Sequence, residues 1–128
     1  MHAAPRRALI QWIVALVLLI AGCSAGPLTR SQQVGSGQAQ VGRDLLADYG
    51  CVGCHVVPGI RAQAAYVGPP LDHWGLRSYI AGALPNNEEN LVRWITDPQE
   101  VEPGTAMPDL GVSRQEATDM AAYLLSLE

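Results

Sequence analysis

The chain has 128 residues, which is enough for one small domain, and its formal net charge is −4. Phenylalanine is absent and aromatic residues make up only 5% of the sequence, so a small domain here lacks the large rings that usually fill its core. The acidic charge argues against a nucleic-acid partner, because it has the same sign as phosphate. The shortage of bulky side chains suggests that a metal or a cofactor completes the core.

Residues 1–22 have the pattern of a bacterial export signal. Arg6 and Arg7 precede an apolar run over 8–21, which is shorter than the about 20 residues of a membrane span. Small residues then lead into Cys23, and this resembles the lipidation site of bacterial lipoproteins. We expect a signal peptide over 1–22, a lipid on Cys23, and a location in the cell envelope facing the periplasm or the outer surface. An uncleaved anchor and an ordinary secreted protein are the alternatives.

Residues 23–40 are predicted to form a flexible, lipid-anchored tether. This segment is rich in glycine, serine and glutamine and has no apolar period. The remaining residues, 41–128, are predicted to form the single folded domain.

The domain is expected to open with a helix that ends at Gly50. Val41, Leu45, Leu46 and Tyr49 share one face at helical spacing, and glycine is a common residue just beyond a helix.

Two further helices are predicted. One begins at Asn86 or Asn87, where an asparagine side chain can cap the helix, and ends before Pro98. The last begins after Ser113, with Glu116 at the position that completes a capping box.

Residues 51–85 are dominated by glycine and proline, so loops are expected there, with a short helix near 77–81. No alternating strand pattern is present. The fold class predicted from these patterns is all-α.

Residues 51–55, CVGCH, hold two cysteines and an adjoining histidine. Zinc would need a fourth ligand, and a redox-active dithiol normally follows a strand in a βαβ unit, which this sequence lacks. A disulfide between Cys51 and Cys54 would leave His55 without a role. The pattern is instead typical of covalent haem attachment, in which both thiols bind the porphyrin and the imidazole binds its iron. The third cysteine, Cys23, is then explained by lipidation.

The chain resembles the class I cytochromes c from about residue 41 to its end. The resemblance rests on CVGCH, on GPPL at 68–71, on PGTAMP at 103–108 and on Tyr123-Leu124, which occur in the order of that family. It implies a small helical fold wrapped around one covalently bound haem c. Gly42 would then allow the first and last helices to cross closely.

The second axial ligand of the iron is expected to be Met107. It lies in a proline-rich loop, whereas Met120 belongs to a helical stripe, where methionine is more often core packing. His73 is the remaining candidate. With His55 and Met107 as axial ligands, no coordination position is open to a substrate, so the expected role is an electron carrier and not an enzyme.

The resemblance also implies further contacts with the haem. The carbonyl of Pro69 would accept a hydrogen bond from the imidazole of His55. Arg77 and Thr105 would lie near a propionate, and Trp94 would line the haem. Three of these residues also have a plain structural interpretation: Pro69 as a loop proline, Arg77 as a surface arginine and Trp94 as a core ring.

The partner is expected to be a redox protein. Removal of 1–22 takes two of the 8 basic residues, so 6 basic residues face 12 acidic residues, a net charge near −6. The domain also resembles the cytochrome c domain appended to the copper subunit of bacterial haem-copper oxidases. We therefore expect a membrane-tethered carrier that delivers electrons to a terminal oxidase. The alternatives are an internal relay subunit of a dehydrogenase or another respiratory complex, and a haem-based sensor.

Overall fold

The computed structural model describes residues 36–63 and 67–128. The predicted signal peptide, Cys23 and the tether up to residue 35 lie outside these ranges. The described elements are four α-helices, two 3₁₀ helices and two short strands: α2 (Ala39–Asp48), η2 (Cys51–Gly53), η3 (Trp74–Leu76), β1 (Tyr79–Ile80), β2 (Leu84–Pro85), α3 (Glu88–Thr96), α4 (Pro98–Val101) and α5 (Arg114–Leu125).

Helix α2 confirms the first predicted helix but begins two residues before Val41. Its N-cap residue is Gln38, whose backbone N–H donates to Asp119 Oδ1 at 2.7 Å. Gly50 ends this helix with φ +74°, a left-handed conformation that glycine adopts without strain. The tether boundary expected at residue 40 therefore lies inside a packed helix.

Helices α3 and α5 confirm the other two predictions. Asn87 caps α3 by accepting from Asn90 N at 3.0 Å, and α5 carries the full capping box between Ser113 and Glu116. Helix α3 ends before Pro98, as predicted. Pro98 also begins the one-turn helix α4, which was not predicted. Proline suits that first helical position because its missing N–H would have no partner there.

The prediction of a short helix near 77–81 is wrong. The chain instead forms η3 and then an antiparallel hairpin, in which Ile80 pairs with Leu84. Ala81 and Gly82 both have positive φ, at 49° and 73°, and such backbone angles turn a hairpin but cannot continue a right-handed helix. Since this sheet has only two strands of two residues, the fold remains the small helical fold of the prediction.

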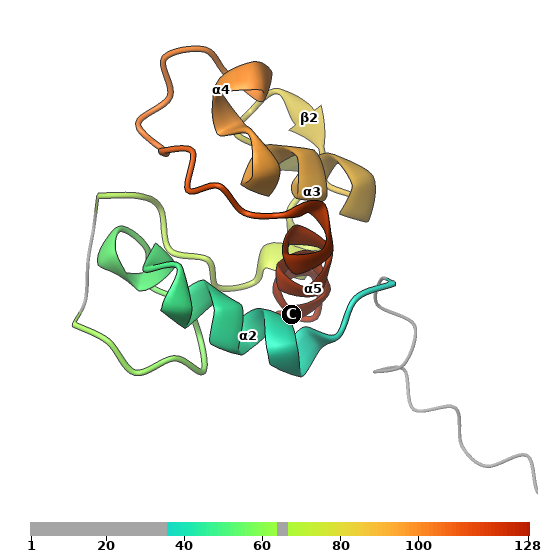
Figure 1. Cartoon of the computed structure of the whole chain (residues 1–128). Coiled ribbons are helices and arrows are strands. Elements are labelled where there is room, and N and C mark those ends of the chain that lie inside the picture. The colour runs from blue at the N-terminus through green and yellow to red at the C-terminus, as the bar shows by residue number, and fades with distance from the viewer. Residues whose placement is uncertain (1–35, 64–66) are drawn as a thin grey trace, which may run out of the picture. The chain divides into compact units, whose positions relative to one another are not determined.

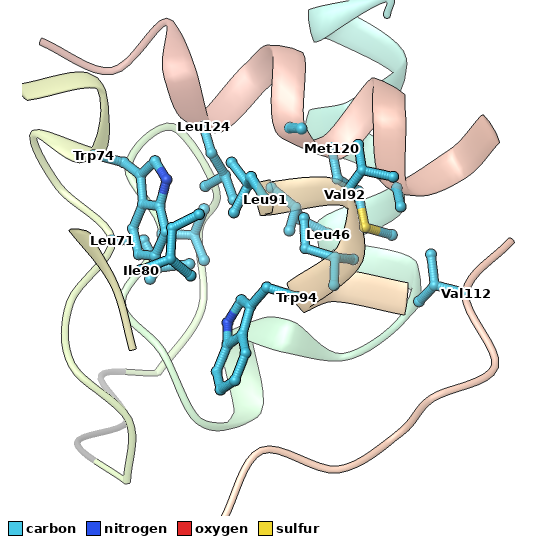
Figure 2. Close-up of a cluster of buried hydrophobic side chains, with 14 residues drawn as sticks. Leu46, Leu71, Trp74, Ile80, Leu91, Val92, Trp94, Val112, Met120 and Leu124 are labelled. Atoms are coloured by element: carbon cyan, nitrogen blue, oxygen red, sulfur yellow. The ribbon is translucent and has the colours of Figure 1, made fainter. Parts of the chain in front are cut away.

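The core lies where α2, α3 and α5 meet. Helix α2 crosses α5 in Figure 1, and a Cβ on Gly42 would come within 2.7 Å of Met120 N, so only glycine permits this close crossing. Figure 2 shows Leu46 from α2 beside Met120 from α5, with Trp74, Leu71 and Ile80 grouped at the other end of the cluster. Within 36–63 and 67–128, none of the helices has the length and apolar character of a membrane span.

Candidate functional site

The two cysteines of the CVGCH motif lie directly after α2. The turn at Gly50 leads into η2, and Cys51 O then accepts from His55 N at 3.0 Å and from Cys54 N at 3.2 Å. This tight turn keeps both thiols and the imidazole on one short piece of backbone. Both cysteines are free and half-buried, so no disulfide joins them in this fold.

Burial is the main cause that raises the pKa of the Cys51 thiol. A backbone hydrogen bond opposes it by a smaller amount, and the neighbouring Cys54 adds the smallest effect, which raises the pKa. A redox-active C-x-x-C pair works in the opposite way, since its attacking thiol has a lowered pKa. The environment of Cys51 therefore argues against a thioredoxin-like dithiol.

The imidazole of His55 is fixed by backbone. Its Nδ1 lies 2.7 Å from the carbonyl oxygen of Pro69. A carbonyl only accepts hydrogen bonds, so Nδ1 is the donor, and in the neutral ring Nε2 presents its lone pair. Such a bond to the second ring nitrogen is the usual way in which proteins orient a metal-binding histidine and raise its basicity.

The backbone of Gly68 supports the same ring. A Cβ at this position would lie 2.6 Å from Nδ1 and 2.8 Å from Nε2 of His55. Two backbone hydrogen bonds hold the two segments together, from Gly68 N to Cys54 O and from Leu71 N to Val56 O, both at 2.8 Å. In the sequence, Gly68 stands out only as part of GPPL at 68–71, and no local pattern indicates its contact with His55.

Of the three candidates for a second axial ligand, Met107 is the one in the loop between α4 and α5. It is half-buried, and it packs against the same hydrophobic cluster as Cys51. Met120 is fully buried within α5 and serves as core, while His73 is exposed and has φ +50°. Thr105 Oγ1 accepts from Met107 N at 3.4 Å, so it binds the loop rather than standing free.

Arg77 and Trp74 form a second polar group near the core. The Arg77 guanidinium lies 4.6 Å from the centroid of the Trp74 ring, and its Nη2 donates to the carbonyls of Pro70 and Asp72. The buried Nε1 of Trp74 has no hydrogen-bond partner among the described residues. The guanidinium of Arg77 is a group that can pair with a carboxylate such as a haem propionate. Trp74 was not among the predicted site residues.

Trp94 is 9% exposed and belongs to the core cluster. In Figure 2 its indole extends from α3 on the side away from Met120, so it borders the cluster instead of filling the α2–α5 crossing. A ring in that position is compatible with lining a planar group.

Sulfur and imidazole donors beside an apolar cluster suit a soft or borderline metal centre, such as iron in a porphyrin, and not a hard cation that prefers oxygen ligands. The fold and these donors together define the class of small helical haem proteins. The model of the cytochrome c family matches residues 39–128, and the chain belongs to this family. Membership implies haem c as the cofactor.

The chain is similar to three proteins that are named cytochrome c oxidase subunit 2. The chain is 41% identical over 91 residues to cytochrome c oxidase subunit 2 of Alkalihalophilus pseudofirmus, which covers 70% of this chain and 26% of the relative. It is 40% identical over 89 residues to the same subunit of Bacillus sp. strain PS3, covering 66% and 25%, and 33% identical over 94 residues to that of Bacillus subtilis, covering 70% and 26%. The chain thus spans about a quarter of the length of these relatives, and it is a haem electron-carrier domain related to theirs.

Proposed function

We propose that this chain carries one haem c, bound through Cys51 and Cys54, with His55 and Met107 as axial ligands of its iron. The observation that carries the proposal is the hydrogen bond between His55 Nδ1 and Pro69 O, because it leaves Nε2 available to bind iron on the residue that directly follows Cys54. Attachment forms one C–S bond at each cysteine, and each thiol hydrogen passes to the vinyl group that the sulfur joins.

The haem supplies a one-electron couple when bound, and the protein residues set its surroundings. Thioether and imidazole ligands together raise the reduction potential and fill both axial positions. With neither position open to a substrate, the chain is an electron carrier and not an enzyme in its own right. Arg77 and Thr105 are proposed to lie near the propionates and Trp94 to line the haem.

The proposed acceptor is a terminal haem-copper oxidase, supported by the relatives named cytochrome c oxidase subunit 2. Those relatives also favour a second candidate, in which the chain is an internal relay subunit of a respiratory complex. Purification in mild detergent distinguishes the two. A free carrier elutes alone and reduces the oxidase as a separate protein, whereas a relay subunit elutes with its complex.

Attachment to a membrane is proposed to occur through a lipid on Cys23, supported by the apolar run and the small residues before it. Replacing Cys23 by alanine should move the protein from the membrane fraction to the soluble fraction. Mass spectrometry of the wild-type N-terminus should find a diacylglyceryl group.

The ligand assignment is tested on the haem-loaded full chain. Its intact mass should increase by one haem, and carbon monoxide should leave the ferrous spectrum unchanged. Met107→Ala should abolish the ferric thioether band and allow carbon monoxide to bind. Met120→Leu, which preserves core volume, should keep the band. Loss of the band in Met120→Leu would refute the assignment, and carbon monoxide binding to the wild type would favour a sensor.

A further inference from the structure

The loop that carries Met107 follows the one-turn helix α4. Asp97 Oδ1 caps this helix by accepting from Glu100 N at 2.9 Å, and Pro98 at its first position is fully buried. Helix α4 is therefore anchored to the core at its beginning, and the side chain of Gln99 starts from a fixed piece of backbone. Figure 1 shows the loop leaving α4 and returning to α5.

The side chain of Gln99 makes three hydrogen bonds to the backbone of this loop. Its Oε1 accepts from Gly104 N at 3.1 Å. Its Nε2 donates to Thr105 O at 2.9 Å and to Met107 O at 3.1 Å. One amide group thus binds one N–H and two carbonyls within four residues, which only a side chain with both an acceptor and two donors can do.

The loop has few other means of holding its shape. Pro103 and Pro108 have no N–H to donate. Thr105 N donates to Glu102 O at 3.1 Å, and Met107 N donates to Thr105 Oγ1 at 3.4 Å. Both of these bonds stay within the loop, whereas the three bonds of Gln99 tie it to α4.

We propose that Gln99 is a positioning residue that holds the loop so that the thioether of Met107 stays at the haem site. The proposal rests on the proposed role of Met107 as an iron ligand. Gln99 acts through the backbone of Gly104, Thr105 and Met107 and does not itself reach the iron. Without it, the loop samples more conformations and the thioether spends more time away from its ligand position, which lowers the fraction of the ligated state.

Gln99→Leu tests this proposal, because leucine is similar in size and makes none of the three bonds. Gln115→Leu is the matched control, since Gln115 is exposed on α5 and its side chain makes no hydrogen bond to the described residues of the loop. The measurement is the affinity of the ferric haem protein for imidazole, which binds only where the thioether has left. We expect this affinity to increase about tenfold in Gln99→Leu, since three exposed hydrogen bonds at the weak end of their range are lost. The control should match the wild type.

Gln99→Glu tests the acceptor bond of the amide separately from its two donor bonds. The carboxylate still accepts from Gly104 N but cannot donate to the carbonyls of Thr105 and Met107. Its imidazole affinity should therefore increase at least as much as that of Gln99→Leu, because a carboxylate would also face two carbonyl oxygens. Hydrogen exchange at the Gly104 amide gives a readout that does not depend on the iron. It should be faster in Gln99→Leu and close to the wild-type rate in Gln99→Glu.

The outcomes separate this proposal from the assignment of Met107. A wild-type protein without a thioether band refutes the assignment and the role of Gln99 with it. A wild-type band together with unchanged imidazole affinity in Gln99→Leu refutes only the role of Gln99. Unfolding by guanidinium identifies a general loss of stability: if Gln99→Leu changed the midpoint while Gly104 exchange stayed the same, Gln99 would be a structural residue and the proposal would be wrong.

Discussion

Gly68 lies directly against the imidazole of His55, so close that a Cβ would be 2.6 Å from Nδ1. The ring is thereby held between this backbone and the carbonyl of Pro69, which lies 2.7 Å from the same nitrogen. Because the φ angle of Gly68 is not in the left-handed region, the need for glycine here is one of space and not of backbone conformation.

Gly68→Ala is therefore expected to displace the His55 ring and to cost about 2 kcal/mol of the free energy of unfolding, within the usual range for overpacking. The ferric haem spectrum should also change, because the histidine can no longer keep its orientation. Gly53→Ala is the matched control, since a Cβ there meets nothing within 4 Å. Equal stability and equal spectra for the two variants would show that the ring has room to move.

Gly42→Ala is expected to separate α2 from α5. Alanine favours a helix over glycine by about 1 kcal/mol, but a Cβ would come within 2.7 Å of Met120 N, which is backbone and cannot move aside. The cost of overpacking, about 1–3 kcal/mol, should exceed this gain in helix propensity. Guanidinium unfolding measures the result, with Gln40→Ala on the exposed face of α2 as the control. A Gly42→Ala protein as stable as the wild type would contradict the close crossing.

Tyr123→Phe removes the hydrogen bond from the tyrosine hydroxyl to Pro58 O, which has a length of 2.5 Å and joins α5 to the segment after the haem motif. The expected cost is about 1 kcal/mol in the free energy of unfolding. Tyr79→Phe is the control because that side chain is 62% exposed.

Alkaline pH tests the burial of the same hydroxyl group. Burial raises the pKa of Tyr123, although Arg43 opposes it. The stability linked to this raised pKa is present below pH 10 and is lost as the pH rises through the folded-state value, so the phenylalanine variant should lose less stability at alkaline pH. An identical alkaline loss in both proteins would mean that Tyr123 does not contribute to it.

Glu116 should make the domain sensitive to acid. Hydrogen bonds with Ser113, and then one from Tyr49 at 2.9 Å, lower the pKa of Glu116 below its usual 4.5. A lowered folded-state pKa contributes stability that is present above pH 4.5 and is lost as the pH falls through the folded-state value. Glu116→Gln should therefore reduce stability at neutral pH and flatten its decline in acid.

The measurement for Glu116 is the Tm of each protein in thermal unfolding between about pH 3 and pH 7, the range in which carboxyl groups titrate. Glu89→Gln, a change at an exposed glutamate of α3, is the control and should leave the acid profile close to that of the wild type. A Glu116→Gln protein with the same pH profile as the wild type would exclude this capping carboxylate as a source of acid sensitivity.

Local chemistry in the sequence determined much of this fold. The spacing of Leu45 and Leu46, the asparagine cap at Asn87 and the capping box at Ser113 are short-range features, and the helices that they predict are present. The motif CVGCH likewise indicated its chemistry by residue type and spacing alone, and the family match agrees with a cytochrome c domain. The helix predictions succeeded because each depends on atoms within about one helical turn.

Only the tertiary structure decided the features that depend on distant segments. The hairpin at Ile80 and Leu84 replaced a predicted helix because two left-handed residues turn the chain there. The contact of Gly68 with His55 and the three bonds of Gln99 to the Met107 loop join residues whose proximity no periodicity encodes. Hydrogen-bond geometry and close packing depend on where the backbone finally lies, so residue type and spacing alone cannot specify them.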